Sequence, residues 1–123
     1  MNFFSRLTGM GGKSWALRDV VAVGAELRWM QADGKSDKLT EAEVKERSQD
    51  RSISLAGVTV SAVVEAPLPD EVASILGHSD TKFFTLDITM PGDPTPITLG
   101  FVDKKMMESL RDQIVQGIER AAA

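Results

Sequence analysis

The chain has 123 residues, of which 42% are hydrophobic and 26% charged, and its formal net charge is −4. This composition is typical of one folded domain and excludes a disordered chain, while the absence of cysteine excludes disulfides and thiolate metal sites. The net negative charge repels phosphate backbones, so no nucleic-acid partner is expected.

No segment has the features of a secretion signal or a membrane span. Residues 1–10 lack a basic region followed by an apolar run, and no apolar run approaches the roughly 18 residues that cross a bilayer. We therefore expect a cytoplasmic protein, with membrane binding disfavoured.

The start of the chain predicts an arm followed by a hinge of glycines within residues 9–12. The apolar residues of the arm stand at helical spacing: Phe3, Phe4 and Leu7. The arm either packs on the core or frays, or it docks on a partner or a membrane surface; the former is favoured, because one or two turns bury too little area for membrane binding alone. We divide the chain into this arm, residues 1–13, and a single α+β domain, residues 14–123.

Two segments alternate with the period of a strand. Residues 20–31 place Val21, Val23, Leu27 and Trp29 on one face, and the alternative, a helix, would carry Gly24 in its middle. Residues 51–65 also alternate, but their phase slips at Ala56-Gly57, which predicts a bulge or bend that curls the sheet or separates two strands.

Two short helices are predicted between the strands. Thr40 and Glu43 form a capping box, so a surface helix is expected over residues 41–49. Residues 70–76 follow two prolines and stop at Gly77, which predicts a second short helix. Its inward-facing residues are expected to be Val72, Ile75 and Leu76.

The final third of the chain predicts a hairpin and a long helix. Residues 84–90 and 97–101 alternate around an exposed PGDPTP loop, so one face of this hairpin should be buried. Asp103 is placed to cap an amphipathic helix over residues 104–122, in which Gly117 indicates close packing against another backbone. The apolar stripe of this helix comprises Met107, Leu110, Ile114, Ile118 and Ala121.

Together these elements predict an α+β fold: a curved, mostly antiparallel sheet with short connecting helices and a long C-terminal amphipathic helix packed on it. This order of elements resembles pleckstrin-homology-like domains in outline, and the size and acidity are similar to those of small secretion or assembly chaperones. No motif of either family is present, so no residue takes a role from the resemblance.

Three apparent motifs lack residues that their chemistry needs. Residues 9–14 end like a phosphate-binding loop, but Leu7 occupies the place of its first glycine. Residues 32–43 are similar to a calcium loop, but Ala32 and Gly34 stand at ligand positions. His78 is the single histidine, which excludes a multi-histidine site. No metal and no cofactor are predicted.

The remaining candidate chemistry lies in carboxylates and tryptophans. The carboxylates near the ends of elements are Asp70, Glu71, Asp87 and Asp103. Caps and solvated faces explain them, and one sequence does not show whether two of them converge. Trp15 and Trp29 either stack a ligand or belong to the core or an interface.

With no catalytic constellation, the sequence favours a non-catalytic protein-binding or adaptor module, including a homodimer formed through an edge strand or the terminal helix. A candidate partner groove lies where the hairpin meets the helix, at Met90, Met106, Met107 and Leu110. One alternative is a small-molecule-binding domain or small enzyme with its site inside the curved sheet, near Trp29, His78 and Asp80. Another is a membrane-surface domain that acts through Phe3, Phe4 and Leu7.

Overall fold

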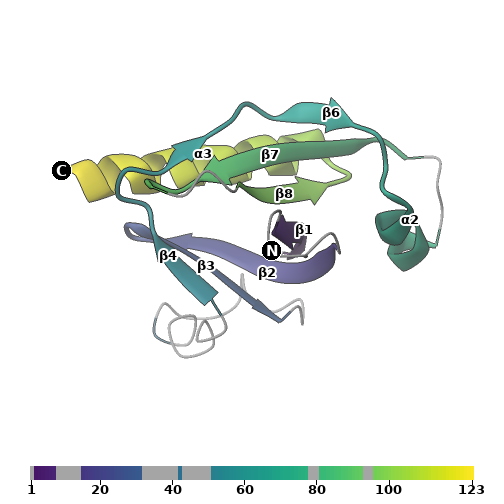
Figure 1. Ribbon diagram of the computed structural model, residues 1–123, viewed down its shortest axis with the longest axis horizontal. Coiled ribbons are helices and arrows are strands. Elements are labelled where there is room, and N and C mark those ends of the chain that lie inside the picture. Colours follow the sequence, from purple (N-terminus) through teal and green to yellow (C-terminus); the bar gives the residue numbers. More distant parts are fainter. Residues whose placement is uncertain (1, 8–14, 32–41, 43–50, 78–80, 93–95) are drawn as a thin grey trace.

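The computed structural model describes residues 2–7, 15–31, 42, 51–77, 81–92 and 96–123, and it confirms the α+β class and the C-terminal helix (Figure 1). The strands are β1 Asn2–Leu7, β2 Ala16–Val23, β3 Glu26–Gln31, β4 Arg51–Ser54, β5 Thr59–Val60, β6 Val64–Ala66, β7 Phe83–Thr89 and β8 Ile97–Phe101; the helices are α2 Asp70–Leu76 and α3 Lys104–Ala122. Within these ranges, no helix is long and apolar enough to cross a membrane. The helix predicted over residues 41–49 lies outside the described residues except for Ala42, which is helical.

All the paired strands run antiparallel, in the order β4-β3-β2-β1-β8-β7-β5, and β6 also pairs with β7. The first strand of the chain, β1, therefore lies in the middle of the sheet, between β2 and β8. It joins the strands of the first half of the chain to the terminal hairpin.

The prediction that residues 1–13 form a helically spaced arm was wrong for residues 2–7, which are this central strand. Phe3 and Ser5 are both buried, with the period of two that a strand requires. Because the second of these buried positions holds a polar residue, the hydrophobic pattern did not alternate. Residues 8–13 lie outside the described residues.

Residues 20–31 are strand as predicted, but they belong to a hairpin rather than to one strand. Gly24, with a φ of +59°, occupies the first central position of a two-residue turn, where the positive φ favours glycine. The register pairs Val20 with Trp29 and Ala22 with Leu27. The expectation that Val21 and Val23 share the face of Leu27 and Trp29 was therefore wrong, because the turn exchanges odd and even positions.

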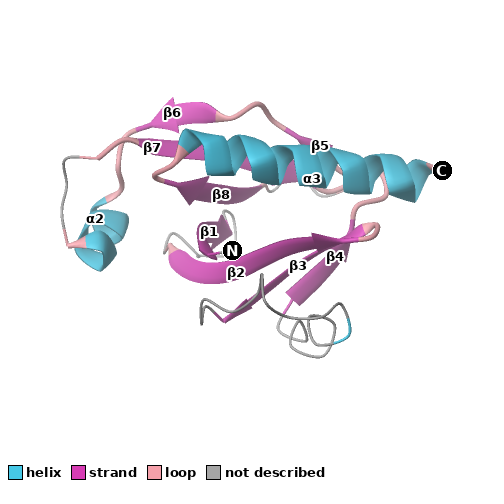
Figure 2. Cartoon of the chain, turned by 180° about the vertical axis from the view of Figure 1, so that it is seen from behind, coloured by secondary structure: helices cyan, strands magenta, loops and turns pink. Residues whose placement is uncertain are grey.

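The predicted phase slip at Ala56-Gly57 is confirmed as a separation of two strands. β4 and β5 stand at opposite ends of the path of seven strands, and six spacings of about 4.8 Å would set them about 29 Å apart in a flat sheet. The five residue steps from Ser54 to Thr59 span at most about 18 Å. The sheet must therefore bend, and Figure 2 shows the linker passing beside α3 from β4 to β5. The described pairings leave the path open between these two strands.

The terminal hairpin and α3 complete the main core. Leu86 and Ile88 of β7 are buried with Ile97 and Leu99 of β8, as the predicted buried face requires. The helix packs on both halves of the sheet, since it contacts β2 and β3 as well as β5, β7 and β8. Its fully buried side chains are Met107, Leu110 and Ile114, with Ile118 partly buried against the same cluster. The predicted Asp103 cap is confirmed, because Asp103 Oδ1 accepts from the backbone N–H of Lys105 at 2.9 Å.

Gly117 lies where α3 meets the linker between β4 and β5. A Cβ on this residue would overlap Cδ1 of the fully buried Leu55 and would lie 3.3 Å from the carbonyl oxygen of Gly24. The predicted close approach to another backbone is therefore confirmed. The glycine sets how near the helix comes to the linker and to the β2–β3 turn.

We expect Gly117→Ala to lower the free energy of unfolding by about 1–3 kcal/mol, because overlap with Leu55 outweighs a gain in helix propensity of up to about 1 kcal/mol. Urea denaturation followed by circular dichroism measures the change. Gln116→Ala, on the exposed side of the same helix, is the control and should be neutral or slightly stabilising. In the Leu55→Ala background the penalty of Gly117→Ala should shrink; an unchanged penalty would contradict the overlap.

Candidate functional site

A hollow of about 600 Å³ opens to solvent on the face of β7 and β8 opposite the main core. We call it the α2–β7 pocket. Its described lining residues are Trp15, Ala66, Pro67, Leu68, Pro69, Asp70, Phe83, Thr85, Asp87, Pro96 and Thr98. The volume lies within the range of small-ligand sites, and the exposed lining is more polar than apolar.

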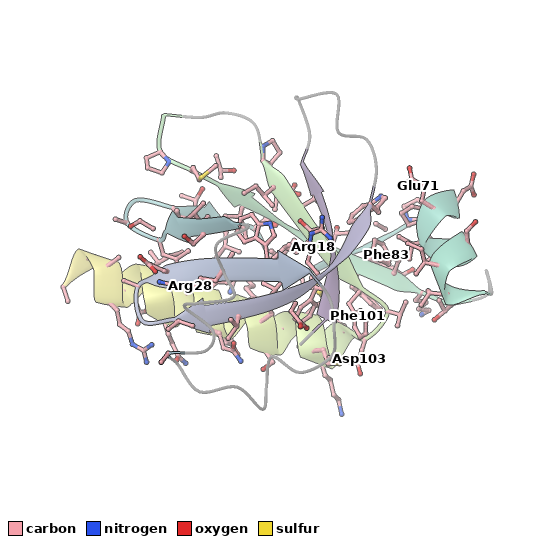
Figure 3. The ribbon with its side chains drawn as sticks, turned by 90° about the horizontal axis from the view of Figure 1, so that it is seen from below. Arg18, Arg28, Glu71, Phe83, Phe101 and Asp103 are labelled. Carbon is pink, nitrogen blue, oxygen red and sulfur yellow. The ribbon has the colours of Figure 1, made fainter. Side chains whose placement is uncertain are left out.

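The pocket exists because a second, smaller core holds α2 against this face. Trp15, Val72 and Phe83 are buried together, and the rings of Trp15 and Phe83 meet edge to face with centroids 5.3 Å apart. The backbone N–H of Trp15 donates to Glu71 Oε2 at 3.0 Å, which ties the helix to the start of β2. Figure 3 shows Glu71 and Phe83 at the end of the molecule where α2 lies.

The short helix α2 is only partly as predicted. Val72 is fully buried, Leu76 packs partly against the same small cluster, and Gly77 ends the helix in the left-handed conformation. Ile75 was expected to face inward, but 52% of it is exposed. The helix has only seven residues, and the stripe formed by positions 72 and 76 supplies its contact with the sheet.

Gly100 provides the space for the ring of Phe83, which lines the pocket. A Cβ on this residue would overlap the ring of Phe83, so the ring lies directly against the backbone of β8. Both residues are buried. The position of Phe83, and through it those of Trp15 and α2, therefore depends on a glycine in the neighbouring strand.

Asp87 is held by three hydrogen bonds. Its backbone N–H donates to Ser61 Oγ at 2.8 Å, and its carbonyl oxygen accepts from the N–H of Ser61 at 2.9 Å. The hydroxyl of Thr98 donates to Asp87 Oδ1 at 2.7 Å. The bonds to Ser61 fix the backbone of Asp87, and the bond from Thr98 orients its exposed carboxylate before a ligand arrives.

The pocket carries negative charge from two separate elements. Asp70 begins α2 and Asp87 lies within β7, and both are exposed to solvent. No Lys, Arg or His occurs among the described lining residues. Among all the residues that the structure describes, no group of three or more His, Asp or Glu side chains is placed to hold a metal ion.

A second, smaller hollow of about 440 Å³ lies between residues 62–63 and α3, beside Glu108, Arg111 and Asp112. Arg111 Nε donates to the carbonyl oxygen of Ser61 at 2.9 Å, so this cation is engaged with the segment between β5 and β6. The hollow has fewer apolar walls than the α2–β7 pocket. Asp112, which is exposed, serves below as a control for charge.

Two of the four residues of the predicted methionine groove are buried in the main core. Met107 and Leu110 are fully buried in the main core, whereas Met90 and Met106 are half-buried and pack against it. The hairpin and the terminal helix do bring these four residues into one region. The contact between the hairpin and the helix buries Met107 and Leu110 completely.

The other predicted positions are also dispersed. Phe3 is a core residue of the central strand, while the side chains of Phe4 and Leu7 are outside the described set; their backbones pair with Gly100 and Ile97. Trp29 is buried in the main core. His78 and Asp80, predicted to be near it, lie outside the described residues.

The sequence analysis did not predict that Asp70 and Asp87 line one hollow together with Thr85 and Thr98. These threonines stand at the polar positions of the hairpin pattern, where a solvated face is the ordinary expectation. The two prolines before α2 were a usable signal, because they mark a rigid segment that returns over that face. Comparison of the chain with family models, curated proteins and solved structures gave no match.

We expect Gly100→Ala to destabilise the fold by about 1–3 kcal/mol and to displace the Phe83 ring, since the new methyl group has no free space. Chemical denaturation measures the loss, and the Trp15 indole N–H resonance reports the displacement. Adding Phe83→Leu to the Gly100→Ala variant should restore part of the lost stability, because the shorter side chain leaves space for the new methyl group on β8. A Trp15 resonance that Gly100→Ala leaves unmoved would contradict this packing.

Proposed function

We propose that this domain is a non-catalytic binding module that holds a segment of a partner protein in the α2–β7 pocket. The observation that carries the proposal is the pocket itself, a hollow of about 600 Å³ lined by polar and apolar side chains, in which the Asp87 carboxylate accepts a hydrogen bond from the Thr98 hydroxyl. Sites with these properties bind ligands with little loss of conformational freedom.

The packing of α3 supports this location over the methionine groove. Its central stripe is buried against its own sheet, so the helix offers no equivalent apolar face there to a partner. The α2–β7 pocket instead lies on the opposite face of β7 and β8, where the smaller core leaves Thr85 and Asp87 within reach of a ligand.

Solvent exposure of the carboxylates supports binding over catalysis. Asp70 and Asp87 are both exposed, whereas acids and bases in active sites are commonly desolvated to tune their proton affinity. The walls of three prolines and Trp15 suit an extended peptide, which buries apolar stems while its backbone stays solvated.

Selection from a random peptide-display library against the immobilised full chain tests the proposal. We expect selected peptides to bind the wild type and to lose about tenfold or more in affinity to Thr85→Phe, whose ring fills the pocket. Fluorescence anisotropy of labelled peptides measures the affinities.

Thr59→Phe is the matched control, because Thr59 is an exposed threonine in a strand away from the pocket. It should leave the affinities unchanged. Peptides that bind Thr85→Phe as tightly as the wild type, or a selection that yields no binder, would refute the pocket as the binding site.

A further inference from the structure

We infer that the partner segment presents a lysine or arginine and that its cationic end lies between Asp70 and Asp87. This inference rests on the proposed function and specifies the chemistry of the ligand. It follows from two properties of the described pocket, its charge and the polarity of its hydrogen-bonding groups.

The charge comes from carboxylates on independently positioned elements. Asp70 is placed by α2, which the small core and the Trp15–Glu71 hydrogen bond hold on the sheet. Asp87 is placed by β7 and by its contacts with Ser61 and Thr98. With no described basic residue in the lining, a cationic ligand is complementary to the site, whereas an acidic one would be repelled.

The charged groups of the pocket lining, the carboxylates of Asp70 and Asp87, are hydrogen-bond acceptors. Carboxylate oxygens only accept, and the hydroxyl hydrogen of Thr98 is already directed to Asp87, which leaves its oxygen free to accept. A ligand that pairs with the two carboxylates must bring donors. Lysine brings three and arginine five, and neither side chain carries an acceptor.

The walls fit the remainder of such a side chain. Trp15, Leu68 and the prolines at 67, 69 and 96 line the same hollow and offer apolar surface to an aliphatic stem. Long basic side chains bury their methylene groups in this way while the charged end stays near water. A partner segment with one basic residue therefore uses both the walls and the floor.

The inference is tested by titrating the ¹⁵N-labelled full chain with short glycine–serine peptides that differ only in one central residue: lysine, arginine, norleucine or glutamate. We expect the lysine and arginine peptides to shift the amides of Thr85, Asp87 and Thr98 and the indole N–H of Trp15. The norleucine peptide should bind more weakly and the glutamate peptide should produce no shift. Added NaCl should weaken binding of the basic peptides, because the carboxylates are exposed.

Matched variants separate charge from structure. Asp87→Asn keeps an acceptor for Thr98. Asp87→Asn and Asp70→Asn should each lower the affinity for the lysine peptide by about two- to fivefold, as expected for the loss of one exposed ion pair. Asp112→Asn makes the same charge change outside the pocket and should have no effect.

The outcomes distinguish the inference from the proposed function. If library-selected peptides shift the pocket resonances but norleucine replaces their basic residue without loss, the ligand chemistry is wrong and the pocket stands. If the selected peptides shift no pocket resonance, the proposed function itself fails. If methylammonium chloride shifts the pocket resonances as strongly as the lysine peptide at equal concentration, the site takes a free amine and the partner segment is refuted.

Discussion

The short linker between β4 and β5 is the constraint on which the rest of the structure depends. It joins strands at opposite ends of the sheet through only a few residues, so a flat sheet is impossible. Leu55 fixes the linker: its backbone N–H donates to the carbonyl oxygen of Ala25 at 2.8 Å, and its side chain is buried against Gly117 of α3. On the other side Gly57 lies against Pro91 of the β7–β8 loop. One crossing thus connects both halves of the sheet and the helix.

Bending gives the two faces of the sheet different roles. The face that α3 covers holds the large apolar cluster, and the apolar stripe of the helix is buried in that cluster. On the opposite face of β7 and β8, α2 packs through Trp15, Val72 and Phe83. The pocket lies on that face, and Trp15 and Phe83 of the small core belong to its lining. Asp70 and Asp87 in the same lining are exposed to solvent.

Local signals predicted much of this fold because capping, turns and alternation depend on neighbouring residues. The Asp103 cap, the Gly77 stop and the terminal hairpin were all predicted correctly. The errors came from pairings between distant residues. Ser5 is buried because β1 lies between β2 and β8, which its own segment does not show. The run of four apolar residues from 20 to 23 hid the turn at Gly24, and counting through that turn assigned the wrong face.

The site was harder to predict than the fold because each of its residues is of a type that is common at its own position in a strand or helix. Asp87, Thr85 and Thr98 occupy polar positions of a hairpin, and Asp70 opens a short helix, where acidic residues are common. Only the placement of α2 over the hairpin brings the two carboxylates to one hollow. The carboxylates of the site decide the ligand's polarity. The Thr98 hydroxyl already donates to Asp87, and carboxylate oxygens only accept, so a partner that pairs with them must supply donors.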